Sequence, residues 1–356
     1  MSTAHLRHAP YLNLITLLML LARMSSTTIL PNEALYHPQD GHHRSQWVRH
    51  ALIDQGPRQE HSVAAVGNDV YIVGGVDYND ASQLRTINRV ELYNVPTDRW
   101  HVAAPLPQPL NHANAAGVGG KLYLLGALSG GMDWIGLPDS YVYNPFNDTW
   151  MSITPMPNGT ARGSSAVGVY KSTVFLAGGM TLLRPYPPGE QNCLWIVSSY
   201  DTVTDSWKTD YPPLPAPRQH VGGAVVNGTF YVIGGRENDI NQYHNTVFAL
   251  DLENPTSWKT LAPMPTARGS VACSARGFRI YCFGGEGNPD NPQRIFNNTE
   301  VYDTETDSWT KLAPMEVPRH GTGAATVGDA IYIPGGGVTT AAYPVGILDS
   351  FTAGFD

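Results

Sequence analysis

Residues 267–315 have the sequence ARGSVACSARGFRIYCFGGEGNPDNPQRIFNNTEVYDTETDSWTKLAPM. This stretch contains four short apolar runs, at Ser270–Ser274, Arg279–Phe283, Glu300–Tyr302 and Trp309–Leu312. β-Branched and aromatic residues fill the runs, and Gly, Pro, Asn and Asp fill the intervals, which is typical of an antiparallel meander. One such sheet cannot bury both of its faces alone, so it needs further sheets beside it.

The same pattern recurs along the chain. A Gly pair, or Gly followed by Ala, closes an apolar run six times, with first members 50 to 56 residues apart: Gly74, Gly126, Gly178, Gly234, Gly284 and Gly335. In four repeats a Tyr follows, and a Trp stands seven residues after it: Tyr93/Trp100, Tyr143/Trp150, Tyr200/Trp207 and Tyr302/Trp309. The fourth repeat differs, because Leu250 replaces the Tyr and Trp258 stands eight residues later.

These repeats resemble the kelch motif, whose family folds as a β-propeller of four-stranded blades. The resemblance covers residues 46–356 and implies six blades. The sixth repeat lacks a Trp, whereas Trp47 stands 53 residues before Trp100 without a repeat of its own. We therefore predict an all-β, six-bladed kelch-type propeller. Its N-terminal strand, residues 46–51, completes the last blade, so that no edge is exposed between the first and last blades.

Residues 1–24 are predicted to be a signal peptide. Arg7 and two His, His5 and His8, precede an apolar run, Tyr11–Ala22, that is too short to span a bilayer comfortably. The segment Ala22-Arg23-Met24 lacks the small final residue of a cleavage site, so an uncleaved anchor or an apolar tail stays open. Four N-glycosylation sequons support the secretory pathway or secretion, at Asn147, Asn158, Asn227 and Asn297.

Residues 25–45, which contain Pro31, Pro38 and the pair His42-His43, are predicted to be a linker. The formal net charge is −8, and no basic stripe is present, so the sequence argues against a nucleic-acid partner. We expect a monomer without a membrane span once the signal is removed. No dinucleotide loop, phosphate loop or Cys-x-x-Cys appears, and we predict no cofactor.

The three cysteines form no evident framework. Cys273 and Cys282 are predicted to lie diagonally on the two strands of one hairpin, an arrangement that would strain a disulfide. Cys193 has no evident partner.

The loops before the first strand and between the second and third strands of each blade should emerge on one face. The loops after the Gly pairs are long and carry aromatic residues, including Trp134, Tyr186, Trp195 and Tyr243. Loops at one end of a rigid ring often hold a binding site. The alternative is that these aromatic residues only pack the loops.

Five arginines stand 16 residues before their Gly pair, and Leu110 replaces the arginine in the second repeat: Arg58, Arg162, Arg218, Arg268 and Arg319. Arginine is a fork of donors suited to carboxylates, phenolates and enolates, and these positions resemble arginines that hold acidic peptides in kelch proteins. The alternative is a brace between blades, bonded to carbonyls or an acid.

Histidines beside two of these arginines, His220 and His320, could act as a catalytic base or donor, as could Tyr243. We predict one pocket at the axial mouth, lined by these three residues with Arg218 and Arg319. The loop Met180–Val197 would cover it.

Galactose oxidase and its relatives also build on kelch-like repeats, so a copper centre must be considered. Such a site needs a cysteine-linked Tyr, a second Tyr and two His. Tyr243-His244 and Cys193 supply only part of this set, and that family has seven blades and further domains. The sequence therefore predicts no metal site.

Three classes of function stay open. A protein-interaction scaffold is widespread in the family, but most scaffolds attach the propeller to another interaction domain, and none is evident. Short kelch proteins of this layout resemble those of filamentous fungi, some of which serve secondary-metabolite pathways. We therefore expect a protein that binds a small organic molecule, anionic or phenolic, as an accessory protein or a non-redox enzyme. A scaffold without catalysis is the alternative, and a redox enzyme is the third class.

Overall fold

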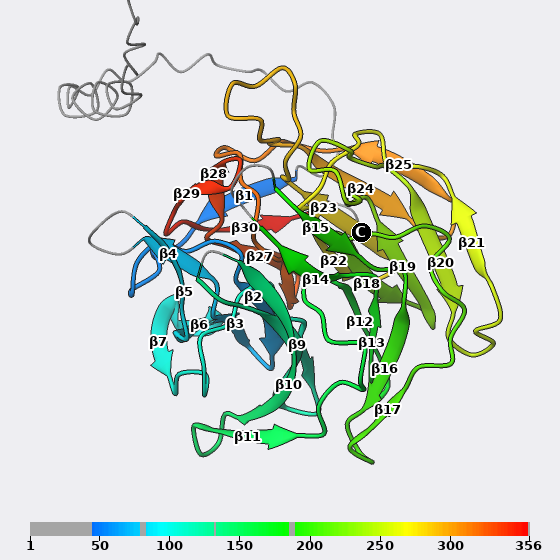
Figure 1. Cartoon of the computed structure of the whole chain (residues 1–356). Helices are drawn as coiled ribbons and strands as arrows, with labels where there is room; N and C mark the ends of the chain where they lie inside the picture. Colours follow the sequence, from blue (N-terminus) through cyan, green and yellow to red (C-terminus); the bar gives the residue numbers. More distant parts are fainter. Residues whose placement is uncertain (1–44, 79–82, 132, 185–188, 355–356) are drawn as a thin grey trace, which may run out of the picture. The chain divides into compact units, whose positions relative to one another are not determined.

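Six antiparallel blades surround one axis in the computed structural model, which describes residues 45–78, 83–131, 133–184 and 189–354 (Figure 1). The innermost strands of blades one to six are β2 (Ser62–Val66), β8 (Ala115–Val118), β12 (Ala166–Tyr170), β18 (Gly222–Val226), β22 (Ala272–Arg276) and β26 (Ala325–Val327). Each of them contacts the innermost strands of both neighbouring blades, and the last contacts the first. The predicted six-bladed ring is therefore confirmed.

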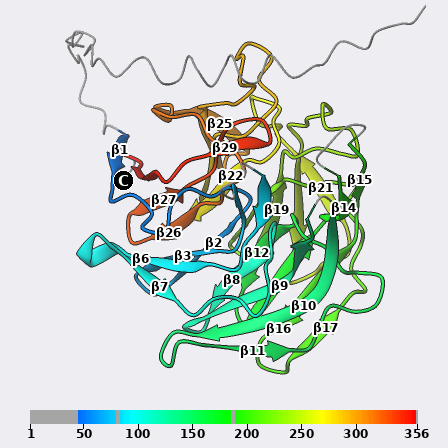
Figure 2. The ribbon, with the colours of Figure 1, turned by 60° about the vertical axis from the view of Figure 1, so that its left-hand side comes forward.

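Each blade continues outward through three more strands (Figure 2). Blade one adds β3 (Asp69–Val73), β6 (Val90–Asn94) and β7 (Arg99–Ala103), and blade two adds β9 (Lys121–Ser129), β10 (Trp134–Asn144) and β11 (Thr149–Ile153). Blade three adds β13 (Thr173–Ala177), β16 (Val197–Asp201) and β17 (Ser206–Lys208), and blade four adds β19 (Thr229–Ile233), β20 (Val247–Asp251) and β21 (Trp258–Leu261). Blade five adds β23 (Arg279–Phe283), β24 (Thr299–Asp303) and β25 (Ser308–Lys311).

Blade six takes its outer strand from the other end of the chain. It adds β27 (Ala330–Pro334), β30 (Leu348–Thr352) and then β1 (Gln46–Arg49), which pairs antiparallel with β30. Trp47 lies opposite Phe351 in this pairing, with ring centroids 4.9 Å apart, and also contacts Phe283 of blade five at 5.6 Å. The predicted closure by the N-terminal strand is confirmed.

Three short hairpins extend the loops between second and third strands. They are β4 (Val76–Tyr78) with β5 (Leu84–Thr86), β14 (Met180–Leu183) with β15 (Gln191–Cys193), and β28 (Gly337–Thr339) with β29 (Ala342–Pro344). The second of these hairpins joins blade two, because Trp134 of β10 pairs with Leu183 of β14. One 3-10 helix, η1 (Val95–Thr97), lies between β6 and β7. The described residues contain no helix that is long and apolar enough to span a membrane.

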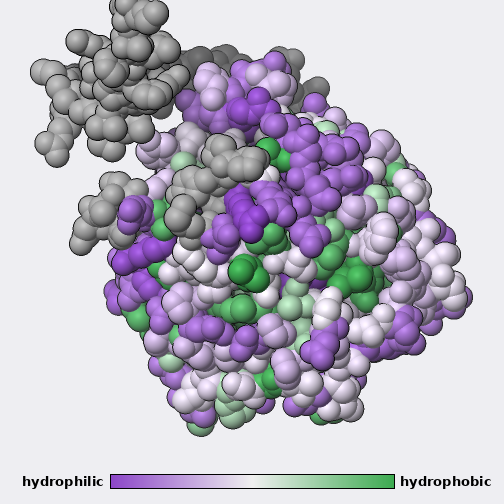
Figure 3. All heavy atoms as spheres, viewed as in Figure 1, coloured by the Kyte–Doolittle hydropathy of each residue, from purple (hydrophilic) through white to green (hydrophobic). Residues whose placement is uncertain are grey.

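Hydrophobic residues fill the spaces between neighbouring blades. One cluster of buried side chains, for example, joins Tyr71 of blade one to Leu122 and Leu124 of blade two. The face in Figure 3 shows hydrophobic residues scattered among hydrophilic ones. The main driving force for the ring is therefore burial between blades, since no single sheet could bury both faces.

Six tryptophans tie each blade to the one before it. Each indole Nε1 donates to a backbone carbonyl of the preceding blade at 2.9 or 3.0 Å: Trp47 to Ala313, Trp100 to Ala51, Trp150 to Ala104, Trp207 to Thr154, Trp258 to Pro212 and Trp309 to Ala262. In four blades an Asp two residues before the Trp accepts from the N–H of that same residue, and from a Tyr hydroxyl. These Asp and Trp side chains, which we call the clamp, therefore satisfy both backbone groups of one residue in the preceding blade.

The clamp explains why the fourth repeat lacks the Tyr of four other repeats and has a different Trp spacing. The residue that Trp258 contacts is Pro212, which has no N–H to donate. An acceptor Asp would have nothing to bind there, and the Tyr that holds such an Asp is replaced by the buried Leu250. The irregular spacing thus matches a change in the neighbouring blade.

The Gly pairs allow close contact between blades. A Cβ on Gly284 would lie 2.2 Å from the carbonyl oxygen of Arg319 in the next blade, and the N–H of Gly285 donates to that oxygen at 2.9 Å. Both glycines have positive φ, of 57° and 106°. A Cβ on Gly285 would lie 2.7 Å from the carbonyl oxygen of Gly269 in its own blade, so both space and conformation require glycine at the two positions.

The diagonal placement of Cys273 and Cys282 was wrong. The turn of this hairpin pairs Arg276 with Arg279, so Cys273 lies directly opposite Cys282, and the two form a disulfide with Cα atoms 4.2 Å apart. Directly opposed residues in antiparallel strands approach closely enough for this bond, whereas diagonal ones are farther apart. Cys193 is a buried free thiol.

Candidate functional site

One residue from each blade, 14 positions before the Gly pair, lies two to four residues before the innermost strand and has a positive φ. These residues are Glu60, His112, Ser164, His220, Ser270 and Gly321, with φ between 49° and 60°. Backbone hydrogen bonds link neighbours in this set, for example from Glu60 N to Gly321 O at 2.6 Å and from His112 N to Glu60 O at 2.9 Å. We call this set the axial ring, because its hydrogen bonds run from blade to blade around the axis.

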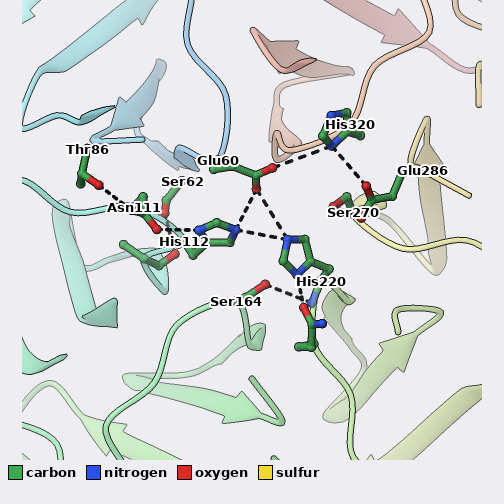
Figure 4. A network of polar contacts seen from close by, with 12 residues as sticks. Glu60, Ser62, Thr86, Asn111, His112, Ser164, His220, Ser270, Glu286 and His320 are labelled. Carbon is green, nitrogen blue, oxygen red and sulfur yellow. Dashed lines mark hydrogen bonds and ion pairs between the residues drawn. The ribbon is translucent and has the colours of Figure 1, made fainter. Parts of the chain in front are cut away.

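Three members of the axial ring carry ionisable side chains that converge (Figure 4). Glu60 Oε2 lies 3.0 Å from His112 Nε2 and 3.8 Å from His220 Nε2, and the two Nε2 atoms are 3.1 Å apart. All three residues are buried. Their three ligand atoms lie within 4.8 Å of one another, which is a geometry that could hold a metal ion.

Two further ionisable groups lie next to this cluster. His320 Nδ1 is 3.8 Å from Glu60 Oε1 and 3.9 Å from Glu286 Oε2, while its Nε2 contacts the carbonyl of Thr339 at 2.8 Å. His320 therefore donates through Nε2, and Nδ1 is left as an acceptor without a hydrogen-bond partner among the described residues. Glu286 is paired with Arg236, whose guanidinium lies against the His220 ring.

The electrostatics of the cluster favour a charged Glu60 carboxylate and a neutral His220 imidazole. Burial acts to raise the pKa of Glu60, but His112, His220 and His320 outweigh it and hold that pKa well below its usual range. Burial, followed by Arg236 and His112, lowers the pKa of His220 well below its usual value. Burial also raises the pKa of Tyr243 to about 12. Tyr243 therefore stays neutral near pH 7.

The axial ring separates two cavities. The larger, of about 490 Å³, is lined by the six innermost strands and extends up to the ring; we call it the channel. The smaller, of about 40 Å³, lies on the loop side; we call it the cup. Its lining combines the cluster with loop residues: Gln59, Glu60, His112, Trp134, Leu183, His220, Arg236, Ile240, Glu286, His320, Thr340 and Ala341. Glu60, His112 and His220 line both cavities.

The five repeated arginines line neither cavity. Each is buried and reaches into its own blade: Arg58 pairs with Glu91, Arg268 with Glu300 and Arg319 with Asp349, Arg218 bonds Glu237 and Thr246, and Arg162 bonds Ser198 and two carbonyls. This placement fits the alternative interpretation of a brace, although within a blade rather than between blades. Their role as ligand contacts stays a prediction.

The predicted pocket is brought together only in part. His220 and His320 meet at the cup, and Leu183 of the expected covering loop lines it, but Arg218 and Arg319 do not. Tyr243 lies beside Arg236 and packs over Gly269 and Gly287. Tyr186 falls outside the described residues.

The two tryptophans predicted to contact the ligand lie in different environments. Trp134 is buried beside His112, with ring centroids 5.4 Å apart, and its indole Nε1 has no hydrogen-bond partner in the part of the chain that the structure describes. Trp195 is 57% exposed and lines neither cavity. The four sequon asparagines, Asn147, Asn158, Asn227 and Asn297, are all exposed.

Sequence reasoning missed Glu60, Arg236 and Glu286. Glu60 shares its repeat position with His112 and His220, and that alignment could have revealed it. Arg236 and Glu286 directly follow their Gly pairs, where the other repeats have Val76, Leu128, Met180 and Gly337. Charged residues in two repeats, at a position that is apolar or glycine in the other four, could have been noticed in the sequence as candidates for a functional role. The metal-like geometry was hidden because its three residues come from three different blades.

Comparison with known proteins gives consistent matches. Residues 158–336 match the family model described as the KLHDC2/KLHL20/DRC7 Kelch-repeats domain, and residues 57–107 match the Kelch motif. The chain is 37% identical over 297 residues to Kelch-like protein terF of Aspergillus terreus, covering 83% of this chain and 64% of that protein.

Two mammalian relatives match over shorter stretches. Kelch-like protein 35 of Mus musculus is 27% identical over 209 residues, covering 59% of this chain and 32% of that protein. Kelch repeat and BTB domain-containing protein 12 of Homo sapiens is 29% identical over 192 residues, covering 50% and 30%. The chain thus spans less than two thirds of the length of each of these three relatives.

Proposed function

This chain belongs to the kelch-repeat family, and from that membership and the polar cluster on its axis we propose that it binds a small organic molecule, anionic or phenolic, at the axial mouth. It would act as an accessory protein or a non-redox enzyme in a secondary-metabolite pathway of the fungal type. The match to a fungal kelch-like protein over 83% of the chain supports this direction.

The observation that carries the proposal is the axial ring. Its six positions share one backbone conformation, and three of them hold Ser164, Ser270 or Gly321. The fold therefore does not require large ionisable side chains there. Burying Glu60, His112 and His220 together carries a desolvation cost that a purely structural ring would avoid, and such clusters are typical of functional sites.

The loop side offers the chemistry that an anionic or phenolic ligand needs. Within the described ranges, His320 Nδ1 is a buried acceptor without a hydrogen-bond partner, and the Trp134 indole N–H is a buried donor without one. A phenol placed in the cup could give its proton to His320 Nδ1 while the Trp134 indole N–H donates to the developing phenolate. The cup encloses only about 40 Å³, so the oxygen-bearing end would enter it while the body lies across the loops.

Metabolite capture by two matched variants tests the proposal. The purified chain is incubated with metabolite extract of the source organism, and retained compounds are identified by mass spectrometry. Ile240→Trp adds bulk to the lining of the cup, and Ala275→Phe adds bulk to the lining of the channel. We expect wild type and Ala275→Phe to retain the same compound and Ile240→Trp to lose it. Retention that survives Ile240→Trp and fails with Ala275→Phe would move the site into the channel, whose volume lies within the usual range for ligand pockets, roughly 300–1,000 Å³.

A protein-interaction scaffold is the second candidate. Trp195 and Tyr343, on the loops after the Gly pairs, are 57% and 65% exposed, and exposed aromatic residues are enriched at interfaces. Kelch domains commonly mediate protein interactions. If wild type retains no small molecule, and Trp195→Ala abolishes binding to a protein partner, this candidate replaces the first.

We also propose that the chain enters the secretory pathway. Four exposed sequon asparagines and the Cys273–Cys282 disulfide suit an oxidising, glycosylating compartment. The predicted signal peptide, residues 1–24, and linker, residues 25–45, fall outside the described residues apart from Ser45. Natively expressed protein that keeps residues 1–24 and carries no glycan at Asn147 or Asn227 would contradict this assignment.

A further inference from the structure

Three electron-pair donors meet at one point on the axis. The distances among Glu60 Oε2, His112 Nε2 and His220 Nε2 are 3.0, 3.1 and 3.8 Å. Ligand atoms of a tetrahedral zinc site with bonds of about 2.05 Å lie about 3.3 Å from one another. The triangle is thus close to one face of such a tetrahedron.

The neighbouring amides determine which imidazole nitrogens carry hydrogen. Asn111 donates through Nδ2 to Thr86 Oγ1 at 2.8 Å, so its Oδ1 is the acceptor that lies 2.6 Å from His112 Nδ1. This hydrogen bond assigns the His112 proton to Nδ1 (Figure 4). His112 Nε2 then presents a lone pair to the cluster.

A hydrogen bond to the preceding amide side chain also determines the tautomer of His220. Gln219 donates through Nε2 to the carbonyl of Glu237 at 3.2 Å and to Gln191, so its Oε1 accepts from His220 Nδ1. His220 Nε2 is then also an unprotonated nitrogen. In both histidines the residue immediately before the ring fixes the tautomer, as outer-sphere partners do for metal-bound histidines.

No cation among the described residues neutralises this point. Glu60 has only histidine side chains as ion-pair partners. Arg236 approaches His220, but its Nη2 is 3.4 Å from Nδ1 and 3.3 Å from Nε2, so it lies between the two nitrogens rather than along one lone pair. Its charge is already paired with Glu286. Three acceptors that face each other in a buried site repel one another unless a cation lies between them.

We propose that Glu60, His112 and His220 bind a divalent transition-metal ion of the zinc class, with the remaining coordination position open to the cup. Two imidazole nitrogens and one carboxylate oxygen form a ligand set that such ions accept, and three protein ligands leave a position for water or substrate. Space for the Glu60 carboxylate exists because position 321 is Gly, where a Cβ would lie 2.5 Å from Glu60 Oε1. The proposed metal site does not depend on the organic ligand proposed above, and either proposal can be correct without the other.

Cobalt and zinc binding to the full chain test the site. Metal is first removed by dialysis against a chelator; Co²⁺ binding is then followed by its visible absorption, and Zn²⁺ binding by calorimetry. We expect one equivalent of metal, with the absorption of a low-coordinate Co²⁺ site. His112→Ser and His220→Ser place at these positions the residue that Ser164 and Ser270 already provide with the same backbone conformation. Each should weaken binding by more than the roughly 10–100-fold typical of outer-sphere changes.

The controls keep the result interpretable. His101→Ser removes an exposed histidine of β7 and should leave binding unchanged. Glu60→Gln preserves the side-chain shape and should also weaken metal binding. It therefore tests the site even if a serine variant fails to fold. The proposal is overturned if wild type binds no stoichiometric metal, which would leave a shared proton as the cation. Equal binding by wild type and both serine variants would also overturn it, because the metal would then lie elsewhere.

Discussion

At the scale of single residues, the same repeat position can serve the fold in one blade and chemistry in another. Arginine recurs in five blades, and regularity of this kind suggested a ring of ligand contacts. In the structure each arginine is buried and bonded to its own blade, as Arg268 is to Glu300. The axial ring, which varies from Glu60 to Gly321, collects the ionisable groups instead. In this chain the repeated arginines are bonded within their blades, whereas the site proposed above uses a repeat position whose residue varies.

The Arg268–Glu300 pair yields the first prediction. Arg268→Ala leaves a fully buried carboxylate unpaired, so it should lower the free energy of unfolding by about 3–5 kcal/mol. Arg276→Ala, which breaks a pair with the exposed Asp329, should cost no more than about 1 kcal/mol. Urea unfolding followed by tryptophan fluorescence measures both. A folded Arg268→Ala protein of normal stability would contradict the role as a brace.

The sequence could predict those site residues that lie near one another along the chain, but not those that come together from different blades. His220 and His320 were found because each stands beside a repeated arginine. Glu60 and His112 approach His220 only when the blades pack around the axis, since the three residues come from blades one, two and four. No spacing within one repeat predicts this contact. The tautomers of His112 and His220 follow from their hydrogen bonds to Asn111 and Gln219, and these can be assigned only when the side-chain positions are known.

At the scale of structural elements, the clamp explains most of the repeat signature. The Tyr, Asp and Trp of one blade act together on a single residue of the preceding blade, as Tyr200, Asp205 and Trp207 do on Thr154. The strand pattern and the Trp spacing were predictable because they are local. The reason for the irregular fourth repeat was not, because it lies in the preceding blade at Pro212. The hairpin register was misjudged for Cys273 and Cys282 because a tight turn sets it.

The clamp predicts a loss of stability at alkaline pH. Burial, and then the hydrogen bond to Asp205, raise the pKa of Tyr200 above its ordinary value of about 10. The folded state therefore holds this proton more tightly than the unfolded state. Its contribution to stability is complete below pH ~10 and is lost as the pH rises towards the folded-state pKa. The other three clamp tyrosines, Tyr93, Tyr143 and Tyr302, should behave in the same way.

Tyr200→Phe provides the measurement. At neutral pH it should cost about 1 kcal/mol, for one lost hydrogen bond. Above pH ~10 the slope of unfolding free energy against pH should become shallower by up to about 1.4 kcal/mol per pH unit, the amount for one proton. The free energies come from urea unfolding at a series of pH values. An unchanged alkaline slope in this variant would show that other groups control it.

At the scale of the whole molecule, the ring is closed by strands from opposite ends of the chain. β1 pairs with β30, and the Trp47 indole contacts the carbonyl of Ala313 in blade five at 3.0 Å. Closure could be predicted because one Trp was missing at the end and one was present in excess at the beginning. It also means that blade six depends on residues more than 300 positions apart.

Two truncations isolate the contribution of β1. Removing residues 1–55 exposes the full edge of β30, whereas removing residues 1–44 keeps β1. We expect the longer deletion to unfold at lower temperature and to self-associate, because an unpaired edge strand binds other chains. The shorter deletion should match the full mature chain. Thermal unfolding and size-exclusion chromatography distinguish the two, and equal behaviour would rule out closure by β1 as a stabilising element.

The order of synthesis gives the β1–β30 pairing a further consequence. β1 is made before every other described strand and β30 after them, so blade six can form only once all the described strands have been made. Until it closes, β1 of one chain and the still unpaired β30 of a second chain offer complementary edges. Exchange of β1 between two molecules would produce a domain-swapped dimer in which each chain completes the other's sixth blade. Rapid closure within one chain, by contrast, preserves the monomer.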